Sequence, residues 1–154
     1  MQYRIIAALA LFASSSLGAQ GTPVPTDLSY AQPIAGSWSY AATAGGSEAT
    51  FADANARPQL TIRCTRAVRR ISILKPTAAA APFLWVWTSS QSRNVPASYD
   101  AASARVSADL AAFDPLLDAI AASRGRIGFS TSGLAALVVP PWGDVGRVIE
   151  DCRV

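Results

Sequence analysis

The side chains best suited to bind a ligand form two short clusters in this sequence. Arg63, Arg66 and Arg70 lie within LTIRCTRAVRRISIL, and Trp85 and Trp87 alternate within FLWVWTSS. Arginine pairs with carboxylates and phosphates, and two tryptophans on one strand face can stack a sugar or a peptide. We predict these five residues as candidate binding residues. The preferred alternatives are structural, namely a solvated strand edge for the arginines and a buried core position for the tryptophans.

The sequence limits catalytic chemistry narrowly. It contains no histidine, which excludes Ser-His-Asp and Cys-His nucleophilic sites and imidazole-based zinc or copper sites. The single lysine, Lys75, follows no Ser-x-x-Lys motif, and neither a glycine-rich phosphate loop nor a calcium loop is present. We therefore predict no catalytic residue, no metal and no cofactor.

Carboxylates are the remaining catalytic option. Asp114 and Asp118 lie four residues apart on one predicted helix, and paired carboxyl groups can hydrolyse glycosides. A carboxylate-dependent hydrolase acting on cell-envelope material is therefore the alternative function. The structural explanation is preferred, because Asp114 precedes Pro115 as a helix N-cap and Asp118 lies in the first turn, where the helix dipole favours negative charge.

The only two cysteines, Cys64 and Cys152, predict one disulfide, because exported domains commonly oxidise such pairs. The bond would close a loop with 87 intervening residues. The chain-entropy model gives about 4–5 kcal/mol for a loop of that size, as an upper figure. Two free thiols are the alternative.

The N-terminal segment predicts export. Arg4 precedes an apolar run from Ile5 to Ala13 and then small residues, which is the layout of a secretory signal peptide over residues 1–19. Residues 20–35 hold three prolines and predict an extended, loosely ordered leader. No later apolar stretch is long enough to span a membrane. The net charge of +3 for the whole chain is too small to indicate a nucleic-acid partner.

Residues 36–154 predict a single domain that is mainly β. Alternating apolar and polar residues indicate antiparallel strands with one wet face, and SRNVPAS (92–98) is interpreted as a turn. Two short helices near the C-terminus follow, one beginning at Pro115 and one with Trp142, Val145, Val148 and Ile149 at helical spacing. The predicted fold is an antiparallel β-sandwich-like domain with two short α-helices. The strands are expected at 36–43, 48–53, 59–65, 69–75, 83–90 and 104–112, with a hairpin over 126–140.

A tryptophan-bearing strand, an Arg-Cys strand, a Gly-Leu hairpin and a terminal cysteine together resemble a loose group of exported bacterial domains. The group includes the invasion-associated locus B family and the periplasmic accessory protein of type VI secretion clusters. The stretch from DPLLDAIAASRGRIGF to VIEDC is also similar to small exported proteins of alphaproteobacteria. The resemblance implies a disulfide-tied β-sandwich in the periplasm, no catalysis and no transferable functional residue. The matching positions are Trp38, Arg63, Cys64, Gly133, Leu134 and Cys152.

These observations predict a periplasmic or secreted, non-catalytic binding or accessory domain. Its expected partner is an envelope protein or a cell-surface component. A purely structural envelope protein is a third interpretation, in which neither the arginines nor the tryptophans bind anything.

Overall fold

The fold is a single curled antiparallel sheet with two short helices. The computed structural model describes residues 27–132 and 134–154, so the predicted signal peptide and Gly133 lie outside the described residues. The strands are β1 (Gly36–Thr43), β2 (Gly46–Asp53), β3 (Pro58–Thr65), β4 (Arg70–Pro76), β5 (Phe83–Trp87), β6 (Ser92–Asp100), β7 (Arg105–Ala111), β8 (Ile127–Thr131) and β9 (Leu137–Val139). The helices are α1 (Pro115–Ala121) and α2 (Gly143–Asp151), and a 3-10 turn spans Arg66–Val68.

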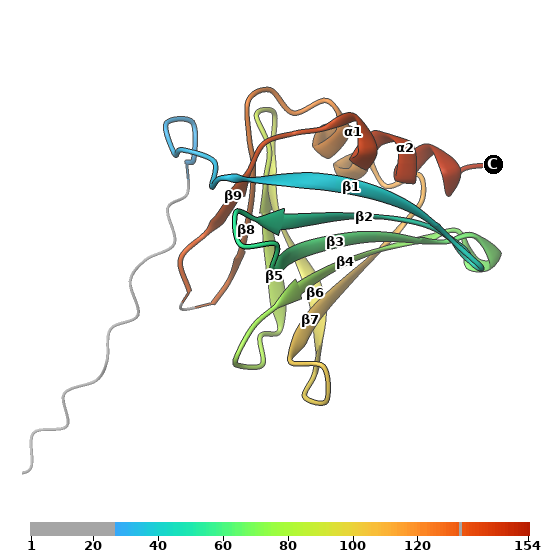
Figure 1. Ribbon diagram of the computed structural model, residues 1–154, viewed down its shortest axis with the longest axis horizontal. Coiled ribbons are helices and arrows are strands. Elements are labelled where there is room, and N and C mark those ends of the chain that lie inside the picture. Colours follow the sequence, from blue (N-terminus) through green and yellow to red (C-terminus); the bar gives the residue numbers. More distant parts are fainter. Residues whose placement is uncertain (1–26, 133) are drawn as a thin grey trace, which may run out of the picture.

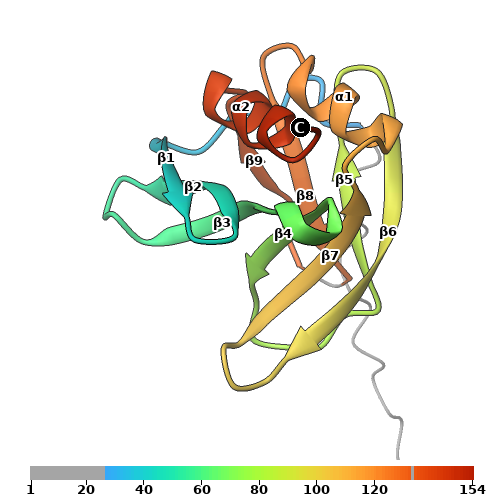
Figure 2. The same cartoon turned by 90° about the vertical axis from the view of Figure 1, so that its right-hand side faces the viewer.

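The sheet is a half-barrel, which corrects the predicted sandwich. Hydrogen bonds link all nine strands in the order β1-β2-β3-β4-β7-β6-β5-β8-β9, and every pairing is antiparallel. The sheet curls from β1–β3 round to β5 and β8, with both helices on one side (Figures 1 and 2). A sandwich needs two separate sheets packed face to face, whereas here the β4–β7 and β6–β7 ladders join the two halves.

The alternation read from the sequence does define the inner face. Leu60, Ile62 and Cys64 of β3 are buried, and so are Ile71 and Ile73 of β4. The intervening residues of β3 and β4 point to the outer face, as the two-residue period requires. The concave side of the sheet is therefore the hydrophobic core.

Both helices complete this core at their predicted positions. Asp114 caps α1 by accepting a hydrogen bond from the Leu116 amide (2.9 Å), and Pro115 begins the helix. Helix α2 packs on β1, β2 and β3 through Val145, Val148 and Ile149. The predicted place of Trp142 on this stripe is wrong, because its side chain is exposed at the residue that precedes the helix.

One strand was mistaken for a turn. SRNVPAS is the larger part of β6, a nine-residue strand that pairs with β5 through Ser92–Pro96 and with β7 through Ala97–Asp100. The asparagine and proline suggested a turn, but proline is tolerated in a strand where no ladder hydrogen bond is needed from its nitrogen.

The predicted leader is ordered where it is described. Leu28 is buried with Trp87 and Val138 on the outer face of the sheet, and the Ile34 amide donates to the Val138 carbonyl (2.9 Å). Gly128 makes room for this segment, since a Cβ there would lie 2.1 Å from the Leu28 side chain. Residues 27–35 are thus packed against β8 and β9 rather than loosely ordered (Figure 1).

Candidate functional site

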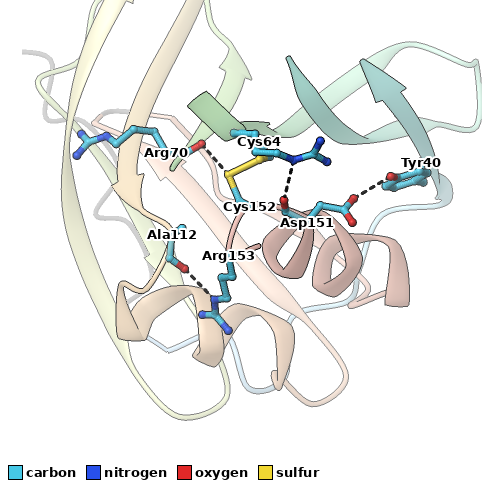
Figure 3. Close-up of a disulfide and its surroundings, with 8 residues drawn as sticks. Tyr40, Cys64, Arg70, Ala112, Asp151, Cys152 and Arg153 are labelled. Carbon is cyan, nitrogen blue, oxygen red and sulfur yellow. Dashed lines mark hydrogen bonds between the residues drawn. A yellow bond between two sulfur atoms is a disulfide. The ribbon is translucent and has the colours of Figure 1, made fainter. Parts of the chain in front are cut away.

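The predicted disulfide is present and joins β3 to the end of α2. Cys64 and Cys152 are bonded, with Cα atoms 5.4 Å apart, and both are almost completely buried. The Cys152 sulfur also lies 3.3 Å from the Arg70 carbonyl oxygen, which is a close contact because a disulfide sulfur carries no proton to donate. Figure 3 shows this bond between the sheet and the C-terminal segment. Its burial makes it a structural cross-link.

Arg66 belongs to this junction and does not face a ligand. Its Nε donates to the backbone carbonyl of Asp151 (3.3 Å), at the C-terminal end of α2, where positive charge is favoured. The Asp151 carboxylate accepts a hydrogen bond from the Tyr40 hydroxyl (2.8 Å), and Arg153 donates to the Ala112 carbonyl (2.9 Å). The contacts drawn in Figure 3 therefore hold the C-terminus to the sheet.

Arg63 is held by an ion pair that the sequence did not reveal. Its Nε and Nη2 both lie 2.9 Å from one oxygen of Glu48, which faces it across the β2–β3 ladder. This bidentate-like arrangement satisfies the guanidinium group. An open groove of about 490 Å³ lies here, but its lining consists of Thr43–Gly45, Glu48, Arg63, Cys64 and Thr65, with no free cation.

Arg70 lies on the edge of a second open groove and is the most available of the three arginines. This groove measures about 440 Å³ and lies on the outer face, lined by Arg70, Pro96–Ser98, Ser107 and Asp109. All ten acidic side chains of the chain fall within the described residues, and none of them forms an ion pair with Arg70 there. Asp109 instead accepts a hydrogen bond from the Ser72 hydroxyl (2.5 Å).

Arg63 and Arg70 were expected to be near neighbours across the hairpin, and the register places them on a diagonal. Arg63 faces Ser72, while Arg70 faces Thr65. Diagonal pairs are about 7–8 Å apart at Cα. The two arginines thus lie in different grooves and do not form one basic site.

The groove at Arg70 exists because the β6–β7 ladder stops there. The last paired residues are Ala97 and Ala108. The Ala97 amide donates to the Pro82 carbonyl on the β5 side (2.9 Å), so the nitrogen of residue 96 faces β7 by alternation. Pro96 has no N–H to donate to Asp109, and β6 diverges towards β5 beyond this point (Figure 2). Pro96 and Asp109 escaped the sequence analysis because only the pairing makes them neighbours.

Trp85 and Trp87 lie on the outer face, which corrects their expected place in the main core. Leu84 and Val86 supply the inner side chains of β5, while Trp87 is buried and Trp85 half-buried against the N-terminal segment. Trp87 is 8% exposed, which leaves no stacking platform. The tryptophans therefore anchor residues 27–35, and the sequence could not show which segment covers them.

The two carboxylates proposed for hydrolysis have separate structural partners. Asp114 caps α1 and pairs with Arg93 (2.8 Å), whereas Asp118 pairs with Arg153 (2.7 Å). Partial burial opposes ionisation of Asp114, but the hydrogen bonds from Arg93 and the Leu116 amide hold its pKa below the ordinary value. A carboxylate with a lowered pKa is a poor general acid.

Lys75 was set aside in the sequence for want of a partner motif, yet it is buried on the inner face of β4. Its position two residues beyond Ile73 was the signal, since alternation places it on the core side. Within residues 27–132 and 134–154, no group of three or more histidine, cysteine, aspartate or glutamate side chains is arranged to hold a metal. Over the same residues, no helix is long and apolar enough to cross a bilayer.

Comparisons with protein-family models, with curated proteins and with solved structures find no match for this chain. The resemblance to the invasion-associated locus B family and to the type VI secretion accessory protein therefore stays a prediction.

Proposed function

We propose that this protein is an exported binding domain that recognises another cell-envelope polypeptide through the groove at Arg70. The observation that carries the proposal is the end of the β6–β7 ladder at Pro96, directly beside an arginine without an acidic partner in the described chain. The partner would enter the groove as an extended segment.

The backbone supports an extended partner. Beyond Ala108, β7 continues to Ala111 while β6 has turned to pair with β5. The peptide groups of Asp109 and Ala111 that face β6 therefore form an edge inside the sheet. Unpaired strand edges bind extended peptides by adding a strand, with main-chain hydrogen bonds supplying affinity.

The side chains support a polar partner with an acidic residue. Ser98 and Ser107 contribute hydroxyl groups to the groove, and Arg70 contributes the positive charge. An aspartate or glutamate of the partner would satisfy Arg70 in the way that Glu48 satisfies Arg63. Such a contact gives specificity and speeds association at low salt.

The expected compartment agrees with this kind of partner. The chain carries a buried disulfide, and disulfides form and persist in oxidising compartments outside the cytosol. Together with the predicted signal peptide, this favours the periplasm or the cell exterior, where the partner would be an envelope protein.

Site-specific photocrosslinking in the native envelope is the direct test. Benzoylphenylalanine would replace Ser98 in the groove or, as the control, Ser39, which is exposed on β1. We expect one polypeptide to crosslink from position 98 and not from position 39, with its identity given by mass spectrometry. Equal crosslinking from both positions would count against the groove.

The purified partner would then be titrated against charge-reversed variants. We expect Arg70→Glu to weaken binding at least tenfold, which corresponds to about 1.4 kcal/mol. Arg124→Glu is the matched control, because Arg124 is also an exposed arginine but lies outside the groove. Equal losses in both variants, or a loss of thermal stability in Arg70→Glu, would reject Arg70 as a binding residue.

A further inference from the structure

The only lysine of the chain is almost fully enclosed by apolar side chains. Lys75 is 9% exposed and shares the inner face of β4 with Ile71 and Ile73. It pairs laterally with Val106 of β7, and the β3–β4 register places Leu60 on its other side. Both of these neighbours are fully buried.

No carboxylate compensates the Lys75 charge. All ten acidic side chains lie in the described residues, and none of them pairs with Lys75 there. The one hydrogen bond described for its Nζ is a long 3.5 Å contact with the Pro76 carbonyl. Burial accordingly lowers the pKa of the Lys75 amine. An isolated buried ammonium is costly, so such a group tends to give up its proton.

The groups facing Lys75 reinforce this interpretation. On the neighbouring strands, Tyr99 is the titratable group of the same face, paired laterally with Val106. Asp100 and Arg105 face each other at the ends of β6 and β7, and alternation turns both to the opposite face. Neither strand therefore offers the amine a negative charge.

A second polar group on the inner face also lacks a partner. The Thr131 hydroxyl of β8 is buried and has no hydrogen-bond partner among the described residues. It belongs to the same face as Phe129, whose side chain is in the core. Native interiors rarely leave such groups unsatisfied, and departures from this rule concentrate at functional positions.

We propose that Lys75 is a reactive amine that captures small apolar aldehydes as an imine. The neutral nitrogen attacks the carbonyl carbon, and the resulting carbinolamine loses its hydroxyl group together with a nitrogen-bound proton as water. The C=O bond is thereby replaced by C=N, with no oxidant or reductant required. Leu60 and Val106 favour an aliphatic body on the aldehyde. Lys75 is the penultimate residue of β4, so it lies near the end of the sheet, where a small molecule can enter. This activity is independent of binding at Arg70, which points to the outer face.

Reductive trapping tests this directly on the folded, disulfide-bonded protein. Butanal and cyanoborohydride would be added between pH 6 and pH 11, with the labelled site identified by peptide mass mapping. The matched control is the double variant Lys75→Met/Arg124→Lys, which moves the single lysine to an exposed position. We expect Lys75 to be labelled at least ten times faster at pH 7 than the lysine introduced at position 124. A pKa lower by one unit gives ten times more neutral amine at that pH.

The proposal requires both this rate advantage and a pH–rate inflection below 10.5, the ordinary lysine value. Labelling at the control rate, an inflection at 10.5, or labelling only after unfolding would overturn it. A measurement without any variant guards against misfolding of the control. Reductive ¹³C-methylation of the wild-type protein, followed by an NMR titration of the dimethyl-lysine signal, must give the same lowered pKa.

Discussion

Removal of the disulfide has an effect that the structure allows us to calculate. In the variant Cys64→Ala/Cys152→Ala, the unfolded chain is no longer closed between residues 88 positions apart. The chain-entropy model assigns about 4.6 kcal/mol to a loop of that length at 25 °C. Marginal stability of about 5–15 kcal/mol is typical of a domain, so the variant should lose a large share of its free energy of unfolding.

The folded state should nevertheless keep α2 in place. Tyr40, Arg66 and Arg153 all hold the C-terminal segment by hydrogen bonds, and Val148 and Ile149 remain buried in the core. Each of these hydrogen bonds contributes about 0.5–1.5 kcal/mol net. The loss therefore arises mainly in the unfolded chain, which becomes more expanded.

Guanidinium unfolding, followed by tryptophan fluorescence and near-ultraviolet circular dichroism, measures both consequences. We expect a lower transition midpoint, a steeper dependence on denaturant because more surface is exposed on unfolding, and an unchanged native spectrum. A destabilisation below about 1 kcal/mol would refute the entropic argument. A native spectrum altered before any denaturant is added would instead show that the bond, and not the other contacts, holds α2 on the sheet.

Three further predictions concern positions whose roles emerged only from the structure. Gly128→Ala should displace Leu28 from the outer face, because the new Cβ would lie 2.1 Å from its side chain; a red-shifted tryptophan emission and a loss of about 2 kcal/mol, within the range for disturbed core packing, would be the signs. Lys75→Met should stabilise the protein by about 1–3 kcal/mol at pH 7, since it removes an uncompensated buried polar group. Because the folded protein releases the Lys75 proton at a lower pH than the unfolded chain, wild-type stability rises with pH up to about 10.5, and thermal unfolding at pH 7 and 10 should show the variant's advantage shrinking. Asp114 has a lowered pKa in the folded state, so its contribution is complete above the unfolded value of 3.8 and is lost as pH falls through the folded value; Arg93→Ala should cost about 0.5–1 kcal/mol near pH 7 and flatten this acid dependence in urea titrations.

Several parts of the fold could be predicted from the sequence because their signals are local. The alternation of Leu60, Ile62 and Cys64 defines the inner face of β3 without reference to any other strand. Asp114 followed by Pro115 marks the start of α1 in the same way. The cysteine pair also needed no structure, since two cysteines allow a single internal disulfide.

The candidate site was less predictable because its properties depend on partners that are distant in sequence. Arg63 and Arg70 looked equivalent, and only the pairing with Glu48 separates the satisfied arginine from the available one. SRNVPAS contained the proline that ends the β6–β7 ladder, but that role appears only when Pro96 lies beside Asp109.

The sequence by itself therefore determined which face of each recognised strand is apolar, where the helices begin and which cysteines can join. Tertiary structure decided that the strands form one curled sheet, that Leu28 covers Trp87 on its outer side, and that Lys75 is enclosed without a counter-charge. The physical reason is range. Side-chain alternation and helix capping act over a few residues, whereas strand register, burial and ion pairing are set by segments that meet only when the whole chain has folded.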